Sequence, residues 1–115
     1  MNASVIKLRK IAHARSGDKG SSANVAVFAN TRDGFEFLRD HLTAQRVEDY
    51  FKAMGVGKVM RYEVANLEAF NFILPQILAG GGSRSLRIDA QGKTLGEAIL
   101  EMTLEIPDSI SKKAL

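Results

Sequence analysis

The sequence predicts an α+β domain, built as an open and mostly antiparallel sheet with helices on one face. Two observations carry this prediction. Five short stretches have the alternation or the β-branched and aromatic content that is typical of strands. Between them lie stretches with apolar side chains three and four residues apart, which is typical of helices packed on a core. The 115 residues are 45% hydrophobic and 25% charged, as in an ordinary globular domain.

The N-terminal part of the chain is expected to form two strands joined by a polar loop. Residues 4–14 alternate, with interruptions at Lys10 and Ile11, and predict a strand with one wet face. Residues 24–30 (NVAVFAN) are rich in Val and Phe and predict a second strand. Turn residues at 16–22 end the first strand, so the two strands are able to pair as a hairpin with a long tip.

Two helices and a third strand are expected next. A turn at 32–34 precedes a short helix, and Thr43 is placed as the N-cap of a second helix that ends at Gly55. Residues 58–64 alternate again and predict the third strand. The apolar stripes of the two helices are Phe35, Leu38 and Leu42 in the first and Val47, Tyr50, Phe51 and Met54 in the second.

The second half is expected to contribute two helices and two strands. Asn66 is placed as the cap of a hydrophobic helix that Pro75 kinks or ends. A short strand at 85–88 precedes a capping box at 94–97, which starts a short helix. Residues 100–106 alternate and predict the last strand.

This order of elements predicts one domain over residues 1–107, followed by a frayed polar tail at 108–115. A ferredoxin-like arrangement is the simplest architecture with these short strands and helices. The pattern leaves the order of the strands in the sheet open.

The composition excludes several classes of function. The chain has no cysteine, which excludes disulfide frameworks, thiolate zinc sites, iron–sulfur clusters and cysteine nucleophiles. No His, Asp or Glu residues have convincing metal-ligand spacing, so neither a metal nor a cofactor is expected. The net charge of +3 is only a modest signal for nucleic acid. No signal peptide or membrane span is recognised, so the expected location is the cytoplasm.

The densest polar segment, residues 13–24, is the first candidate site. Its glycines allow backbone N–H groups to converge on an anion, and basic side chains add positive charge. The competing interpretation is a hairpin tip with Asp18 in an Asx turn. The candidate ligand-binding residues of this segment are Arg15, Ser16, Gly17, Lys19, Gly20 and Asn24.

His13 and Asp18 in the same segment are the candidate catalytic pair. A histidine near an aspartate is able to act with it in acid/base catalysis. The competing interpretation places His13 on a strand, packed against the surface of the sheet. Whether the protein is an enzyme stays open on these residues alone.

Three consecutive glycines at 80–82 form the second candidate site. They exceed what a helix C-cap needs, so a ligand or another backbone approaches closely here, or the segment is a flexible connector. Arg84 follows and has the fork geometry that suits a carboxylate or phosphate. Gly81, Gly82 and Arg84 are therefore added to the candidate ligand-binding residues.

These segments also carry a resemblance to a known family. Residues 13–20, followed by Asn24, resemble the opening motif of the AtuA-like domain, which is the C-terminal part of the acyclic terpene utilisation proteins. The resemblance extends over about residues 6–107 and implies a ferredoxin-like fold. The other matching segments are 61–63, 66–67, 69–72, 80–87, Asp89 and 92–93.

The resemblance further implies a partner and a metabolic setting. In the larger family members this domain follows a large N-terminal region that is missing here, and the family is linked to the breakdown of branched acyl-CoA-type compounds. We therefore expect a small subunit that assembles with itself or with a separately encoded large AtuA-type chain. The expected ligand is an anionic small molecule, for example an acyl-CoA of branched acyl or terpenoid catabolism. The alternatives are an enzyme that uses Asp18 and His13 and, least favoured, a nucleic-acid binder.

Overall fold

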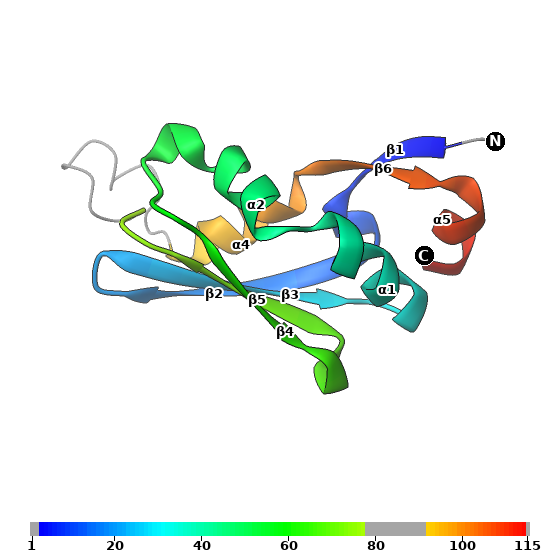
Figure 1. Cartoon of the computed structure of the whole chain (residues 1–115), viewed down its shortest axis with the longest axis horizontal. Coiled ribbons are helices and arrows are strands. Elements are labelled where there is room, and N and C mark those ends of the chain that lie inside the picture. The colour runs from blue at the N-terminus through cyan, green and yellow to red at the C-terminus, as the bar shows by residue number, and fades with distance from the viewer. Residues whose placement is uncertain (1–2, 78–91, 115) are drawn as a thin grey trace.

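The computed structural model describes residues 3–77 and 92–114, which form two antiparallel sheets and four α-helices (Figure 1). The larger sheet has the strand order β2-β3-β5-β4, and the smaller sheet pairs β1 with β6. The strands are β1 (Ala3–Lys7), β2 (Ala12–Lys19), β3 (Ser22–Ala29), β4 (Met60–Val64), β5 (Ala69–Leu74) and β6 (Thr103–Pro107). The α-helices are α1 (Arg32–His41), α2 (Ala44–Tyr50), α4 (Gly92–Leu100) and α5 (Asp108–Ala114). Three short 3-10 helices are η1 (Leu8–Lys10), η2 (Lys52–Met54) and η3 (Ala65–Leu67).

The order of the larger sheet explains its ferredoxin-like character. β2 and β3 form one hairpin, β4 and β5 form another, and β5 lies between β3 and β4. Helices α1 and α2 therefore connect two strands that are not neighbours, as in the split units of ferredoxin-like folds. The same neighbour order arises from a β-α-β-β-α-β chain whose last strand is moved to the front. The predicted α+β ferredoxin-like fold is confirmed.

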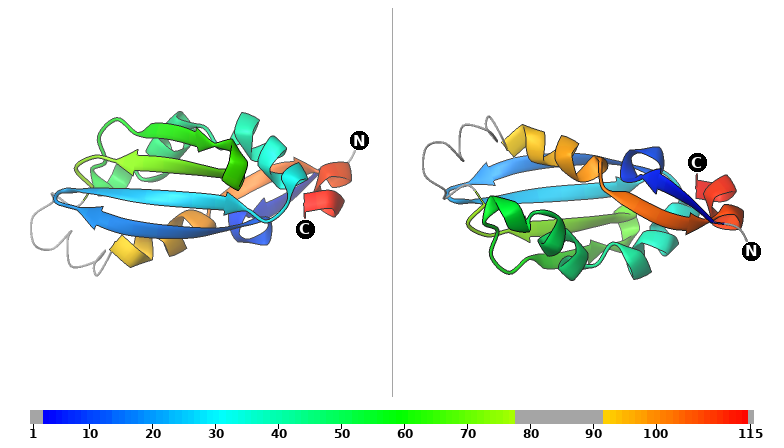
Figure 2. Two further views of the ribbon diagram at one scale, coloured as in Figure 1. Left: turned by 90° about the horizontal axis from the view of Figure 1, so that it is seen from below. Right: turned by 90° about the horizontal axis from the view of Figure 1, so that it is seen from above.

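The helices are distributed unequally over the two faces of the larger sheet. Helices α1, α2 and α4 lie on one face, and among the described residues no helix lies on the other face (Figure 1). The left view of Figure 2 looks onto this uncovered face, with the four strands in front of the helices. Helix α5 and the β1–β6 pair lie beyond one end of the sheet (Figure 2).

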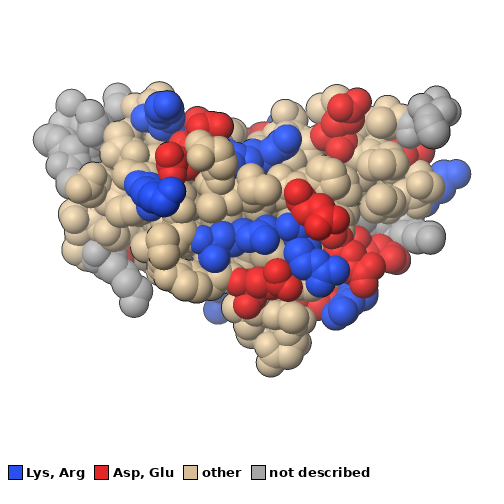
Figure 3. Space-filling view, viewed as in Figure 1, with Lys and Arg blue, Asp and Glu red and all other residues tan. Residues whose placement is uncertain are grey.

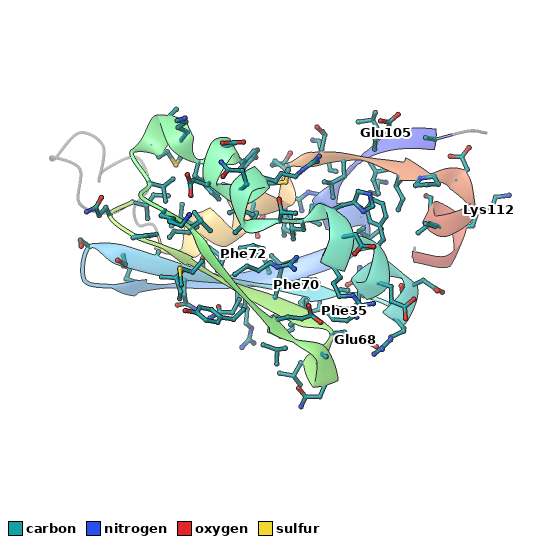
Figure 4. The ribbon with its side chains drawn as sticks, viewed as in Figure 1. Phe35, Glu68, Phe70, Phe72, Glu105 and Lys112 are labelled. Atoms are coloured by element: carbon teal, nitrogen blue, oxygen red, sulfur yellow. The ribbon has the colours of Figure 1, made fainter. Side chains whose placement is uncertain are left out.

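The hydrophobic core lies between the larger sheet and its helices (Figure 4). Phe70 and Phe72 of β5 are fully buried, and the ring of Phe35 from α1 stacks on Phe70 with centroids 5.0 Å apart. The guanidinium of Arg61 lies 4.9 Å from the centre of the Phe70 ring. It also donates a hydrogen bond of 2.9 Å to the carbonyl of Leu42, so a cation caps the C-terminal end of α1.

Local capping sets where α1 and α2 begin. The hydroxyl of Thr31 accepts a hydrogen bond of 3.0 Å from the backbone N–H of Gly34, so the predicted turn at 32–34 is the first turn of α1. Thr43 caps α2 as predicted, because its hydroxyl accepts from the N–H of Arg46 at 3.1 Å. Gly55, with a φ of 83°, follows η2 and ends this helical segment as predicted.

The helix predicted to follow Asn66 is wrong. Asn66 lies in η3, and the next residues form the central strand β5. The apolar run fits a helix and a strand almost equally well, and Phe70, Phe72 and Leu74 are buried with the period of two that belongs to a strand. Aromatic and β-branched side chains favour the strand. A position in the middle of a sheet also accounts for apolar residues on both faces.

The polar segment forms a strand where a long hairpin tip was predicted. β2 continues to Lys19 and β3 begins at Ser22, so Gly20 and Ser21 alone make the turn. Gly20 has a φ of 64°, which the absence of a side chain permits. Asp18 faces Ala23 across the ladder, so it is not part of an Asx turn. The backbone pairing of two eight-residue strands replaces the side-chain turn that the composition suggested.

Three smaller differences concern the ends of elements. The strand predicted at 4–14 is broken by η1, where the N–H of Leu8 donates to the carbonyl of Met102 at 2.8 Å. Helix α4 begins at Gly92, ahead of the capping box at 94–97. Where a frayed tail was expected after Pro107, the chain forms α5, held by a hydrogen bond of 2.7 Å from Ser4 to Asp108. The strand predicted at 85–88 lies outside the described residues.

Candidate functional site

The uncovered side of the larger sheet, which we call the open face, carries alternate residues of all four strands. The register between the strands arranges these residues in three rows across the sheet. From β2 to β4 the rows are His13, Phe28, Ala69 and Val64, then Arg15, Ala26, Asn71 and Tyr62, then Gly17, Asn24, Ile73 and Met60. None of these positions carries Asp or Glu.

The open face brings together part of the site that the sequence predicted. Arg15 is exposed, and Gly17 of the same strand faces Asn24 across the ladder. The side-chain amide of Asn24 donates a hydrogen bond of 3.2 Å to the amide oxygen of Asn71 on β5. This corner of the sheet therefore combines a positive charge with amide groups and no opposing carboxylate.

Ser16 and Asp18 lie on the other side of β2, toward the helices. The hydroxyl of Ser16 accepts a hydrogen bond of 3.0 Å from the backbone N–H of Gly96 in α4. A Cβ atom at Gly96 would lie 3.1 Å from that hydroxyl and 3.5 Å from the backbone nitrogen of Ser16. Ser16 thus fixes the close packing of α4 on β2, and it does not share a surface with Arg15.

His13 and Asp18 are not brought together. Five positions along a strand separate them by about 17 Å, and their side chains leave opposite faces of the sheet. The ring of His13 stacks on Phe28 with centroids 5.2 Å apart, and its Nδ1 lies 3.1 Å from Oδ1 of Asn30. This geometry agrees with the competing interpretation of a histidine packed on the sheet surface.

Three predicted site residues and one further side chain are not placed by the structure. Gly81, Gly82 and Arg84 lie outside the described residues, as does the side chain of Lys19. Gly20 is described, and it serves the turn between β2 and β3.

Sequence reasoning missed the apolar members of the open face. Met60 and Tyr62 are 45% and 50% exposed, although their strand belongs to the larger sheet. The alternation at 58–64 puts these two residues on one side of a strand, but it does not say which side the helices cover. Asn71 and Ile73 were hidden by the helix that was predicted in place of β5.

A pocket of about 280 Å³ lies elsewhere, between α1 and α5, and none of the predicted site residues lines it. Its wall includes Asp33, Glu36, Asp40 and His41, and the His41 ring stacks on Phe37 at 4.2 Å. Within residues 3–77 and 92–114, no group of three or more His, Asp or Glu residues is arranged to hold a metal ion.

The groups with resolved pKa shifts, Arg9, Tyr50 and Glu101, lie around α4. Hydrogen bonds from Lys7 and then Arg9 hold the pKa of Glu101 below its usual value, over distances of 2.8 and 2.6 Å. The same contact with Glu101 raises the pKa of Arg9. Burial raises the pKa of Tyr50, whose hydroxyl donates to the carbonyl of Ala98 at 2.7 Å. These groups tie β1, η1 and α2 to α4, which is a structural task.

Comparison with known proteins identifies the family and no individual relative. Among the residues that the structure describes, no helix is long and apolar enough to cross a membrane. Neither the curated proteins nor the solved structures include one that matches this chain. The family model of the AtuA ferredoxin-like domain matches residues 6–105 of the 115, in agreement with the predicted resemblance and with the topology of the larger sheet. The chain therefore belongs to the AtuA ferredoxin-like domain family.

Proposed function

We propose that this chain is an assembly module, a small subunit that docks on another protein chain through the open face. The observation that carries this proposal is a sheet face that none of the described helices covers and on which Met60 and Tyr62 are about half exposed. Phe28, Val64 and Ile73 on the same face are each only partly buried.

The composition of the open face supports this proposal. The solvated face of an antiparallel sheet is ordinarily polar, and alternation of apolar and polar residues is its usual sign. Here most positions are apolar or aromatic, and Arg15 and His13 at the β2 edge are the basic ones in the three rows. A continuous exposed apolar patch is typical of surfaces that bind other proteins.

The setting of this module follows from the family. Its domain resembles one that is joined to a large region in other family members, so a separately encoded large AtuA-type chain is one candidate partner, and a second copy is the other. In this proposal the assembly serves branched acyl or terpenoid catabolism in the cytoplasm.

An anionic small molecule such as an acyl-CoA is the second candidate, as a ligand at the β2 corner of the same face. It is supported by an exposed Arg15 on the same face as the hydrogen-bonded Asn24 and Asn71 amides, with no carboxylate in the three rows. The side of the molecule in Figure 3 mixes both signs of charge. The chain also contains ion pairs such as Arg39–Glu63 at 3.8 Å. Such mixing does not favour the backbone of a nucleic acid. The separation of His13 from Asp18 removes the geometric basis for the proposed acid/base pair.

Native mass spectrometry of the protein purified gently from its own source tests the assembly proposal. We expect a complex heavier than one chain, and we expect Met60→Lys to release it, because an ammonium group would be buried in the contact. Val5→Lys is the matched control, since Val5 is 70% exposed on β1, away from the open face.

Two results would contradict the proposal. One is a wild-type protein that is monomeric in this measurement even at high protein concentration, and the other is a complex that survives Met60→Lys as well as Val5→Lys. A retained anion would appear as extra mass on the complex, and its loss in Arg15→Ala would place it at the β2 corner.

A further inference from the structure

We propose that the chain docked on the open face is a second copy of this chain, held face to face with β2 of one copy over β4 of its partner. This inference rests on the proposed function and goes beyond it by naming the partner and its orientation. It follows from the order of side chains in the three rows.

A pair of identical chains that share one surface is related by a two-fold axis. If that axis runs parallel to the strands, between β3 and β5, each row of one copy meets the same row of the other in reverse order. β2 then faces β4 of the second copy, and β3 faces β5. Aligned packing of two sheets is the common geometry for such faces.

One pair in each outer row is complementary in size under this arrangement, while Asn24 faces Ile73 in the third row. Phe28 of one copy faces Ala69 of the other, and Met60 faces Gly17. A large side chain therefore meets a small one at four symmetric places, as interdigitated packing between sheets requires. In the first row His13 faces Val64, the remaining pair at the edges.

The middle row pairs a cation with an aromatic ring. Arg15 of one copy faces Tyr62 of the other, and the pair occurs twice by symmetry. A guanidinium over a tyrosine ring is favourable, more so when water is excluded. An axis perpendicular to the strands would instead place Arg15 over its own symmetry copy. The repulsion of two like charges in a contact selects the parallel axis.

The area of the open face sets the strength to expect. Four strands and three rows span a flat area of about 400 Å² per copy, from the spacing of strands and residues. This is about half of the roughly 800 Å² per partner that a standard specific interface buries, and contacts of this size are weak and transient. We therefore expect a dimer whose population rises with protein concentration.

Disulfide cross-linking tests the orientation directly, because the chain has no cysteine of its own. Gly17→Cys and Met60→Cys are made as two separate variants and mixed in equal amounts with oxidised glutathione. A Cβ at Gly17 meets nothing closer than 3.5 Å, so the first substitution fits the sheet. Within one copy the two positions lie on opposite edge strands, about 14 Å apart, too far for a disulfide.

We expect a covalent dimer on non-reducing gels from the mixture and none from either variant alone. Equal cross-linking in all three samples, or none in the mixture while sedimentation still shows a dimer, overturns the proposed orientation. A wild-type protein that stays monomeric at high concentration overturns the second copy as the partner. If Met60→Lys still releases a larger foreign chain in that case, the assembly module stands and only its partner was wrong.

Discussion

The two faces of the larger sheet are formed by the same four strands, but their side chains differ in burial. Phe72 on the covered face is fully buried between β5 and the helices, whereas Phe28 on the open face is partly exposed and stacks on His13. Alternation along each strand sends neighbouring residues to opposite faces. The covered face therefore carries the stability of the fold, and the open face is available to bind.

This comparison also distinguishes apolar residues that form the core from apolar residues that are exposed on the open face. Val25 and Val27 are apolar because they are in the core, and their exposure is zero. Met60 and Tyr62 are apolar or aromatic without being in the core of this chain. A sheet that was merely solvated on one side would have no need of them there.

Truncating one phenylalanine on each face gives the largest expected contrast. Phe72→Ala is expected to lower the free energy of unfolding by about 3–5 kcal/mol, since it empties a fully buried site. Phe28→Ala is expected to cost about 1 kcal/mol or less, because its ring is partly exposed. Urea unfolding at low protein concentration, where a dimer does not contribute, measures both values. Equal losses would mean that the open face is part of the core.

Substituting two glycines is expected to give a smaller contrast in stability. Gly96 of α4 packs against β2 from the helix side, and Gly17 belongs to β2 and lies on the open face. Gly96→Val is expected to cost about 1–3 kcal/mol, because the new Cβ would lie 3.1 Å from Ser16 in a closely packed contact. Gly17→Val is expected to be neutral or stabilising in the monomer, because its Cβ has ordinary space and valine favours a strand. Thermal unfolding of the two variants compares them. A Gly96→Val protein as stable as the wild type would refute the close approach of α4 to β2.

The smallest expected effect is the pH dependence of stability that Glu101 contributes, and this residue lies on neither face of the larger sheet. Glu101 has a lowered pKa, so the stability that it contributes is present above its unfolded pKa and is lost as the pH falls through its folded pKa. The melting temperature of the wild type is therefore expected to fall more than that of Glu101→Gln below about pH 4.5. Because Lys7 and Arg9 are exposed, the difference is small and is reduced by salt. If the melting temperatures of the two proteins fall equally with pH, the ion pairs of Glu101 do not contribute to stability.

Much of the fold was predictable because its signals are local. Thr43 and Gly55 mark the ends of the helical segment that contains α2, and the alternation at 100–106 predicts β6 to within a few residues. β5 was missed because Phe70, Phe72 and Leu74 sit in an apolar run that also fits a helix. The choice between the two depends on pairing with β3 and β4, which is not a local property.

The candidate site was predictable only in part, for a related reason. The polar segment at 13–24 was identified by composition, but its side chains divide between two faces once it becomes a strand. Arg15 and Asn24 remain on one face, while Ser16 and Asp18 go to the other. Tyr62 and Asn71 join Arg15 only through the register of distant strands, which no spacing in the sequence encodes.

The pairing of β1 with β6 has a consequence for the order of folding. The β2–β3 and β4–β5 hairpins join residues that are close in the chain, whereas the hydrogen bond from Ser4 to Asp108 spans 104 positions. Closing so long a loop is entropically costly and slow, and it gains little until the intervening chain is compact. We therefore expect the β1–β6 pair to form last and to open first, while the larger sheet stays intact. The end of the molecule that holds β1, β6 and α5 is then the natural starting point of its unfolding.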